Sequence, residues 1–243
     1  MDSSAARYLG ALTAEVADVV GAGLVGAYPH GSLMLGGYRP LRSDIDVVVV
    51  VEGALSPDEQ SEIAARLAHD ALPCPAIGLE LSVVTRAVAA APNVRPAFEL
   101  HVTTAEQDRK LVDGHGHPGD LDLVLHFAVC HALGYPPFAE VPRTLVLARV
   151  SDELTWAVEH VPDEYAVLNA CRALHYATDG ALVSKVAGGE WALTRLSGAE
   201  RTIVDAALAR QQETDPTAAL DPVAVRRFVS ELQRQVDGRR ATS

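Results

Sequence analysis

Two aspartates at the start of a valine run are the residues whose types and spacing most directly indicate chemistry. Asp44 and Asp46 flank Ile45 and lead into five consecutive valines, residues 47–51, which predict a buried strand. Side chains two positions apart in a strand point the same way, so the two carboxylates should project side by side. Burying such a pair is costly without a cation, and oxygen ligands of this kind suit Mg²⁺. By itself, the same pattern is also compatible with two solvated aspartates at the start of a strand.

A Gly-Ser turn shortly before this strand strengthens the chemical interpretation. Gly31 permits a tight turn and close backbone approach, and Ser32 can offer its hydroxyl and N–H to a phosphate. Together with the aspartates, these residues resemble the signature of the nucleotidyltransferase superfamily, which has the polymerase-β-like fold. The resemblance implies that Gly31, Ser32 and Ser43 contact a nucleoside triphosphate and that Asp44 and Asp46 hold Mg²⁺.

A third carboxylate, Glu80, lies inside the next predicted strand, residues 77–84. A charge among apolar strand residues is costly unless it has a partner or a function. Beside the Asp-x-Asp strand, Glu80 could act as a general base that takes a proton from an attacking hydroxyl. An edge strand with its polar face outward, including Ser82, is the structural alternative.

The rest of the chain divides into two predicted domains. The periodicity predicts a helix over 4–22 and strands over 24–28, 45–51, 77–84 and 98–103. A capping pattern at Ser56 predicts a further helix that runs to about residue 71, and the later helices are expected over about 119–134, 142–160, 164–178, 188–196, 197–212 and 221–237. The expected fold class is therefore α+β. A nucleotidyltransferase domain with a small mixed sheet would occupy residues 1–115, and an all-α helical bundle would occupy residues 116–243.

Composition narrows the classes of partner. The formal net charge of −12 argues against a protein that grips a nucleic-acid backbone and is compatible with a small cationic partner. The three cysteines are far apart and show no metal-ligand spacing, which indicates reduced thiols. The first residues show no basic region of the kind that begins a signal peptide, and no apolar run reaches membrane length, so we expect neither export nor membrane insertion. We expect a cytoplasmic monomer without a nucleic-acid or membrane partner.

Over about residues 20–196 the layout resembles the aminoglycoside adenylyltransferases of the streptomycin/spectinomycin type. The segments that carry this resemblance are residues 79–84, 120–123, 168–172 and 184–185. The resemblance implies ATP as co-substrate, Glu80 as catalytic base, Asp122 near the nucleotide, and Arg172 and Lys185 on the triphosphate. An arginine fork and a lysine would also suit a triphosphate on charge alone. Arg172 could instead form a buried structural pair with an aspartate, and Lys185 could be there by chance.

Three residues before the Arg172 segment are candidates for the acceptor site. Trp156, Glu159 and Asp163 resemble the tryptophan and acidic residues with which this family holds its drug. An aromatic face and carboxylates would attract a polycationic aminoglycoside. The alternative is that Trp156 is a core residue at helical spacing and that the two acids form a solvated face.

These features predict an ATP- and Mg²⁺-dependent nucleotidyltransferase that adenylylates a hydroxyl of an aminoglycoside or aminocyclitol antibiotic such as streptomycin or spectinomycin. Two alternatives stay open. The acceptor could be another small metabolite or a protein side chain, or the chain could be a nucleotide-binding module without turnover.

Overall fold

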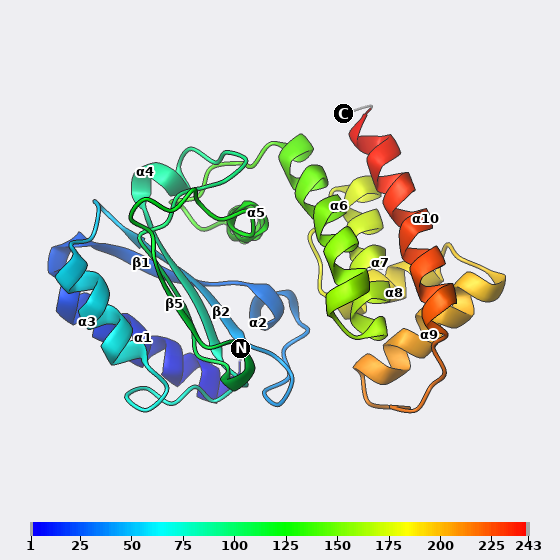
Figure 1. Cartoon of the computed structure of the whole chain (residues 1–243), viewed down its shortest axis with the longest axis horizontal. Helices are drawn as coiled ribbons and strands as arrows, with labels where there is room; N and C mark the ends of the chain where they lie inside the picture. Colours follow the sequence, from blue (N-terminus) through cyan, green and yellow to red (C-terminus); the bar gives the residue numbers. More distant parts are fainter. Residues whose placement is uncertain (1, 242–243) are drawn as a thin grey trace. The chain divides into compact units, whose positions relative to one another are not determined.

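The computed structural model describes residues 2–241, which form two compact units. The first unit ends at Val141 and contains the sheet, and the second begins at Pro142 and is helical. This arrangement confirms the predicted fold class, a mixed sheet domain followed by a helical part. Figure 1 shows the elements of both units along the chain. Each unit is described separately below.

The first unit is built on a five-stranded sheet whose order follows the sequence. Its strands are β1 (Leu24–Pro29), β2 (Ile45–Val51), β3 (Leu79–Thr85), β4 (Leu100–Thr103) and β5 (Lys110–Asp113). Only β2 and β3 pair in parallel, and the other neighbours are antiparallel. The edge strand β5 was not predicted. It is short and mostly exposed, so it lacks the apolar alternation that reveals a strand in a sequence.

One face of this sheet forms the hydrophobic core. Alternate β2 residues from Ile45 to Val51 pack with α1 (Ser3–Val20) and α3 (Pro57–Leu67), which lie together on this face in Figure 1. The helix α1 begins where Asp2 accepts hydrogen bonds from two backbone N–H groups. At α3, Ser56 and Glu59 form a capping box. The apolar face of β2 therefore leaves Asp46, of opposite parity, on the other side of the sheet.

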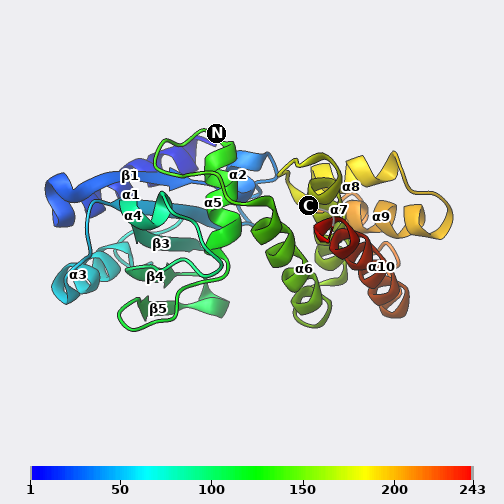
Figure 2. The same ribbon diagram turned by 90° about the horizontal axis from the view of Figure 1, so that it is seen from above.

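That other side is covered by α5 (Leu123–Ala132), while α2 (Gly31–Leu35) and α4 (Arg86–Ala89) connect strands. Figures 1 and 2 show α5 across the sheet from α1 and α3. The hydroxyl of Tyr135 donates to the Pro29 carbonyl at 2.9 Å, and Phe138 packs on Phe127 and Tyr28. These contacts explain why the first unit extends to Val141.

The unit division thus differs from the predicted boundary between residues 115 and 116. The helix expected over 119–134 is present, but its buried face covers the sheet. Its sequence is apolar on most sides, so periodicity could not indicate which unit it would cover.

The second unit consists of the helices α6 (Arg143–His160), α7 (Asp163–Asp179), α8 (Lys185–Leu193), α9 (Gly198–Gln211) and α10 (Pro222–Arg240). Most of α7 is buried, so this helix is the centre of the bundle. Arg143 donates to the carbonyls of Tyr176 and Ala177 at the end of α7. A Cβ on Gly188 would lie 2.7 Å from the Arg172 Cα, so α8 approaches α7 closely.

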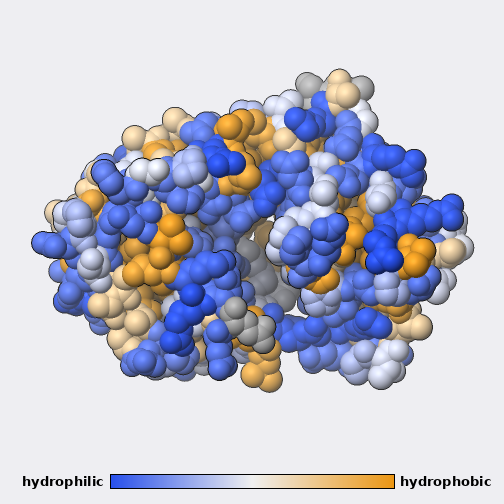
Figure 3. Space-filling view, in the orientation of Figure 1, coloured by the Kyte–Doolittle hydropathy of each residue, from blue (hydrophilic) through white to orange (hydrophobic). Residues whose placement is uncertain are grey.

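Hydrophilic residues dominate the surface drawn in Figure 3, and hydrophobic residues gather only in small patches. Among the described residues, no helix has both the length and the apolar character needed to span a membrane.

Candidate functional site

The structure brings the three predicted carboxylates together on the α5-facing side of the sheet. Asp46 and Glu80 are direct neighbours in the parallel register of β2 and β3, and Asp44 immediately precedes β2. Neighbouring residues in register point to the same face, so Asp46 and Glu80 project together. The odd-numbered residues of β2 and β3 face the hydrophobic core, so the even-numbered residues Asp46 and Glu80 lie on the other face of the sheet.

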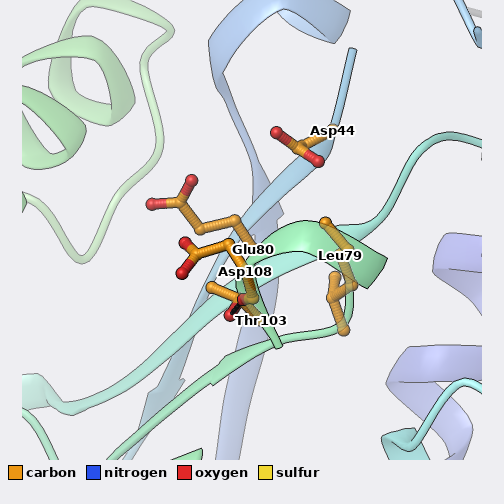
Figure 4. Close-up of a pocket in the computed structure, with 6 residues that line it drawn as sticks. Asp44, Leu79, Glu80, Thr103 and Asp108 are labelled. Carbon is orange, nitrogen blue, oxygen red and sulfur yellow. Dashed lines mark hydrogen bonds between the residues drawn. The ribbon is translucent and has the colours of Figure 1, made fainter. Parts of the chain in front are cut away.

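A small cavity of about 50 Å³ opens beside these residues, lined by Asp44, Leu79, Glu80, Thr103, Ala105 and Asp108. Figure 4 shows the carboxylates of Asp44, Glu80 and Asp108 around it. Asp108 also pairs with Lys110, which follows it at the start of β5. Sequence reasoning missed Asp108 because nothing in the sequence indicates that a loop beyond β4 returns to the first strands.

The glycine turn makes close contact with Asp46. Gly31 has a φ of +56°, and a Cβ at this position would lie 1.8 Å from the Asp46 Oδ2 atom. The His30 N–H donates to the Asp46 carbonyl at 2.9 Å, and the Ser32 N–H donates to the Asp46 carboxylate. Glycine is therefore required at position 31 for two reasons: it permits the positive φ, and it leaves the space that the Asp46 carboxylate fills.

The ionisation of Asp46 is strongly perturbed. Burial, together with the Glu80 and Asp44 carboxylates, raises the pKa of Asp46 from 3.8 to about 7. The nearby His126 and the hydrogen bond from the Ser32 N–H both oppose this rise in pKa. Near neutral pH the site therefore holds more negative charge than it can stabilise by itself, which is the electrostatic setting for a bound cation.

Two histidines, which the sequence did not reveal as site residues, complete this environment. His30 is 3% exposed, and its ring centroid lies 4.4 Å from that of His126 on α5. Burial and the neighbouring His126 hold the pKa of His30 well below its usual range. The only sequence signal for His126 is its place one helical turn after Asp122.

The donor set fits Mg²⁺ through two carboxylates. Within residues 2–241, no three histidine, cysteine, aspartate or glutamate side chains form a ready-made metal cluster. Mg²⁺ is commonly bound through one or two carboxylates plus substrate phosphates, so such a cluster is not required before the nucleotide arrives. The raised pKa of Asp46 and the oxygen-only donors Asp44 and Asp46 are consistent with this mode of binding.

Two further predicted nucleotide contacts lie in the first unit. The Ser43 hydroxyl accepts from the Arg39 N–H at 3.1 Å and thereby closes the turn that leads into β2. Asp122 lies at the N-cap of α5, is exposed and makes no side-chain capping bond. Ser43 thus has a structural task of its own, whereas the side chain of Asp122 is accessible to solvent.

The predicted triphosphate contacts are in the second unit. Arg172 pairs with Glu153 at 3.2 Å and donates to the Asn169 Oδ1 at 2.5 Å. This corresponds to the structural alternative considered for Arg172, with a glutamate of α6 in place of an aspartate. Lys185 begins α8, and its Nζ lies 3.6 Å from the ring centroid of Tyr165. Both cations are thus held in place by side chains of neighbouring helices.

The predicted acceptor residues occupy the end of α6 and the start of α7. Trp156 is 50% exposed and stacks on His160, with ring centroids 5.1 Å apart. It is not a core residue, so the structural alternative for Trp156 is wrong. Glu159 is exposed and Asp163 is half-buried at the first position of α7. An accessible aromatic face with two acids nearby in the sequence could contact a cationic ligand.

Comparison with known proteins places this geometry in context. Residues 138–235 match a family described as the C-terminal domain of aminoglycoside adenylyltransferases. The chain is 26% identical over 210 residues to the spectinomycin 9-adenylyltransferases of two Staphylococcus aureus strains, Mu50 and N315, and the alignment covers 79% of the chain and 79% of each relative.

A solved structure extends the likeness to the whole fold. It is described as spectinomycin adenyltransferase AAD(9) from Enterococcus faecialis with ATP and spectinomycin. It matches with a TM-score of 0.67 and 14% identity, and the match covers 96% of this chain and 99% of that one. At this identity the match establishes a shared fold.

Proposed function

We propose that the chain is a member of the aminoglycoside adenylyltransferase family of nucleotidyltransferases and that it transfers AMP from ATP to a hydroxyl of spectinomycin or a related aminocyclitol. The names of its relatives support the substrate class. The observation that carries the chemistry is the register of Asp46 and Glu80 beside the Gly31 turn. This register places a candidate base, Glu80, and a candidate cation ligand, Asp46, side by side on one face of the sheet, where the backbone at Gly31 approaches Asp46 closely.

In the proposed reaction Glu80 takes the proton from the acceptor hydroxyl. The resulting oxygen forms a bond to the α-phosphorus of ATP while the bond to the leaving pyrophosphate breaks. Asp44 and Asp46 would hold Mg²⁺, which neutralises charge on the phosphates when bound. Gly31 and Ser32 would contact the triphosphate from the turn that lies against Asp46, because the missing Cβ at Gly31 lets this turn approach the carboxylate. Catalysis would consist mainly of positioning and charge compensation.

Residues outside the carboxylate cluster have supporting roles in this proposal. Ser43 and Asp122 would contact the nucleotide, and Arg172 and Lys185 would offset the charge of the triphosphate. For Arg172 this requires that the guanidinium bind Glu153 and the triphosphate at the same time, which its five N–H donors permit.

Trp156, Glu159 and Asp163 would bind the cationic acceptor, whose approach the net charge of −12 would favour. We further propose that the protein acts as a monomer in the cytoplasm, where ATP is available.

An acceptor panel tests the function. Purified protein would be incubated with ATP, Mg²⁺ and one of spectinomycin, streptomycin, kanamycin or no acceptor, and pyrophosphate release would be recorded. We expect release with spectinomycin or streptomycin, and only background release with kanamycin or without an acceptor. Mass spectrometry of the drug should show one added AMP. Binding of ATP without release for any drug would contradict the acceptor class and leave the fold assignment intact.

A further inference from the structure

We propose that Asp108 is a specificity-determining residue that binds a cationic group of the acceptor, and that Lys110 pairs with Asp108 until the acceptor replaces it. The inference rests on the proposed function and deepens it, because it assigns a residue of the first unit to the acceptor. Neither Asp108 nor Lys110 belongs to the predicted site.

A line of paired residues across the sheet indicates the side from which the acceptor reaches Glu80. Asp46 of β2 pairs with Glu80 of β3, and Glu80 pairs with Thr103 of β4. Thr103 in turn pairs with Lys110 of β5. Residues in direct register point to the same face, so these side chains all lie on the face that carries the site. The Gly31 turn, the proposed triphosphate contact, lies against Asp46 at the far end of this line, which leaves the β4–β5 side of Glu80 to the acceptor.

Asp108 is held on this side of Glu80 by backbone hydrogen bonds. Its carbonyl accepts from the Thr103 hydroxyl, and the same hydroxyl accepts from the Lys110 N–H at 2.9 Å. The Asp108 N–H donates to the Ala105 carbonyl at 3.1 Å. Because Thr103 is the direct neighbour of Glu80 in the sheet, these bonds fix the backbone of Asp108 relative to the proposed base.

The carboxylates of Asp108 and Glu80 line the same cavity, whose volume is about 50 Å³. Figure 4 shows both carboxylates turned in the same direction. The cavity is far smaller than the space that a drug-sized molecule fills, so it would receive only a small group of the acceptor. An aminocyclitol carries amino groups and hydroxyls on one ring. A hydroxyl that faces Glu80 would therefore bring a neighbouring ammonium group to Asp108, which would bind it by charge-assisted hydrogen bonds.

Lys110 provides Asp108 with a cation that the acceptor can replace. Its Nζ lies 2.5 Å from the Asp108 Oδ1, and both side chains are more than half exposed. An ion pair in such an exposed position contributes little to stability, so a competing cation can displace Lys110 at low cost. A neutral acceptor could not take its place, because Asp108 would then lose its cationic partner. This exchange would favour cationic acceptors over neutral ones.

The proposal predicts opposite effects for the two members of this ion pair. Asp108→Asn removes the charge that would bind the acceptor, whereas Lys110→Met removes only the competing cation. Glu106→Gln is the matched control: it also removes a negative charge from the turn η2 (Glu106–Asp108), and Glu106 is not among the residues that line the cavity. Calorimetry would give the dissociation constant of α,β-methylene ATP with Mg²⁺, and then that of spectinomycin in their presence. The melting temperature of each variant would be measured in parallel.

We expect Asp108→Asn to bind spectinomycin about 10-fold more weakly than the wild type, with the same affinity for the ATP analogue and the same melting temperature. Lys110→Met should bind spectinomycin at least as tightly as the wild type, and Glu106→Gln should bind it equally well. Wild-type affinity for spectinomycin in Asp108→Asn would overturn the proposal. Equal weakening by Asp108→Asn and Lys110→Met would also overturn it, because the pair would then serve only the structure of the loop. If the wild type bound the ATP analogue but not spectinomycin, the proposed acceptor class would fail and this inference with it.

Discussion

Replacing Gly31 with alanine tests whether the close approach of the turn to Asp46 is needed for activity. An alanine at a φ of +56° costs about 1–2 kcal/mol in any location. At Gly31 there is a second cost, because the new Cβ would lie 1.8 Å from the Asp46 Oδ2. Ordinary contact between such atoms is about 3.3 Å or more, so the carboxylate must move by about 1.5 Å.

Gly36→Ala is the matched control for this substitution. Gly36 ends the same short helix with a φ of +84°, and a Cβ there would meet nothing within 4 Å. The backbone strain should cost each variant about 1–2 kcal/mol of stability, which lowers the melting temperature by a few degrees in a chain of this size, and Gly31→Ala should lose more because of its contact with Asp46. Only Gly31→Ala should displace a catalytic group, and a misplacement of about 1 Å costs on the order of 100-fold in rate.

The assay is kcat/KM for pyrophosphate release with ATP, Mg²⁺ and spectinomycin, with melting temperatures measured in parallel. We expect Gly36→Ala to stay within about threefold of the wild type and Gly31→Ala to fall by about 100-fold or more. Equal activity in the two variants would refute the reasoning. It would show that the close approach of Gly31 to Asp46 has no effect on activity beyond that of the backbone strain common to both positions.

Three other predictions follow from contacts in the two units. Burial and like charges raise the pKa of Asp46 from 3.8 to about 7, so the folded state loses stability as pH rises from about 4 to about 7, and the loss is complete above that range. Without Mg²⁺, Asp46→Asn should therefore be more stable than the wild type at pH 8, by at most about 4 kcal/mol, and should lose this advantage near pH 4. Urea unfolding at both pH values checks this, and a destabilised Asp46→Asn at pH 8 would contradict it. Lys185→Met removes the contact with Tyr165 and should cost under about 1 kcal/mol in thermal unfolding. Its KM for ATP should nevertheless rise about 10-fold, and an unchanged KM would remove Lys185 from the triphosphate site. Trp156→Ala should raise the KM for spectinomycin with little effect on melting, since Trp156 is 50% exposed. Trp191→Ala is its control, and should instead lower stability because Trp191 stacks on His175 and donates to Asp179; matching KM values in the two tryptophan variants would contradict the acceptor assignment.

The sequence could predict those parts of the fold that depend on local patterns. The valine run after Asp46 predicts a buried strand, and the period of two predicts that Asp44 and Asp46 share one face of it. The capping pattern at Ser56 likewise predicts the start of α3. Each of these conclusions depends on residues that are close together in the chain.

What the sequence could not predict depends on contacts between distant residues. The packing of α5 on the sheet involves contacts such as that between Tyr28 and Tyr135, which are far apart in the chain, so the sequence could not indicate that the first unit extends to Val141. His126 belongs to an apolar helix and becomes informative only when His30 is seen against it. The partner of Arg172 is Glu153 on the preceding helix, which no periodicity reveals.

The role of Glu80 is tested most directly by comparing the wild type with Glu80→Gln. Both proteins would be titrated with ATP and Mg²⁺ by calorimetry, and AMP transfer to spectinomycin would then be followed in a single turnover. Glutamine keeps the size of the side chain and removes its ability to take a proton, so we expect Glu80→Gln to bind ATP like the wild type and to transfer AMP at least about 100-fold more slowly. Transfer at the wild-type rate by Glu80→Gln would contradict the assignment of Glu80 as the base on which this account of the site depends.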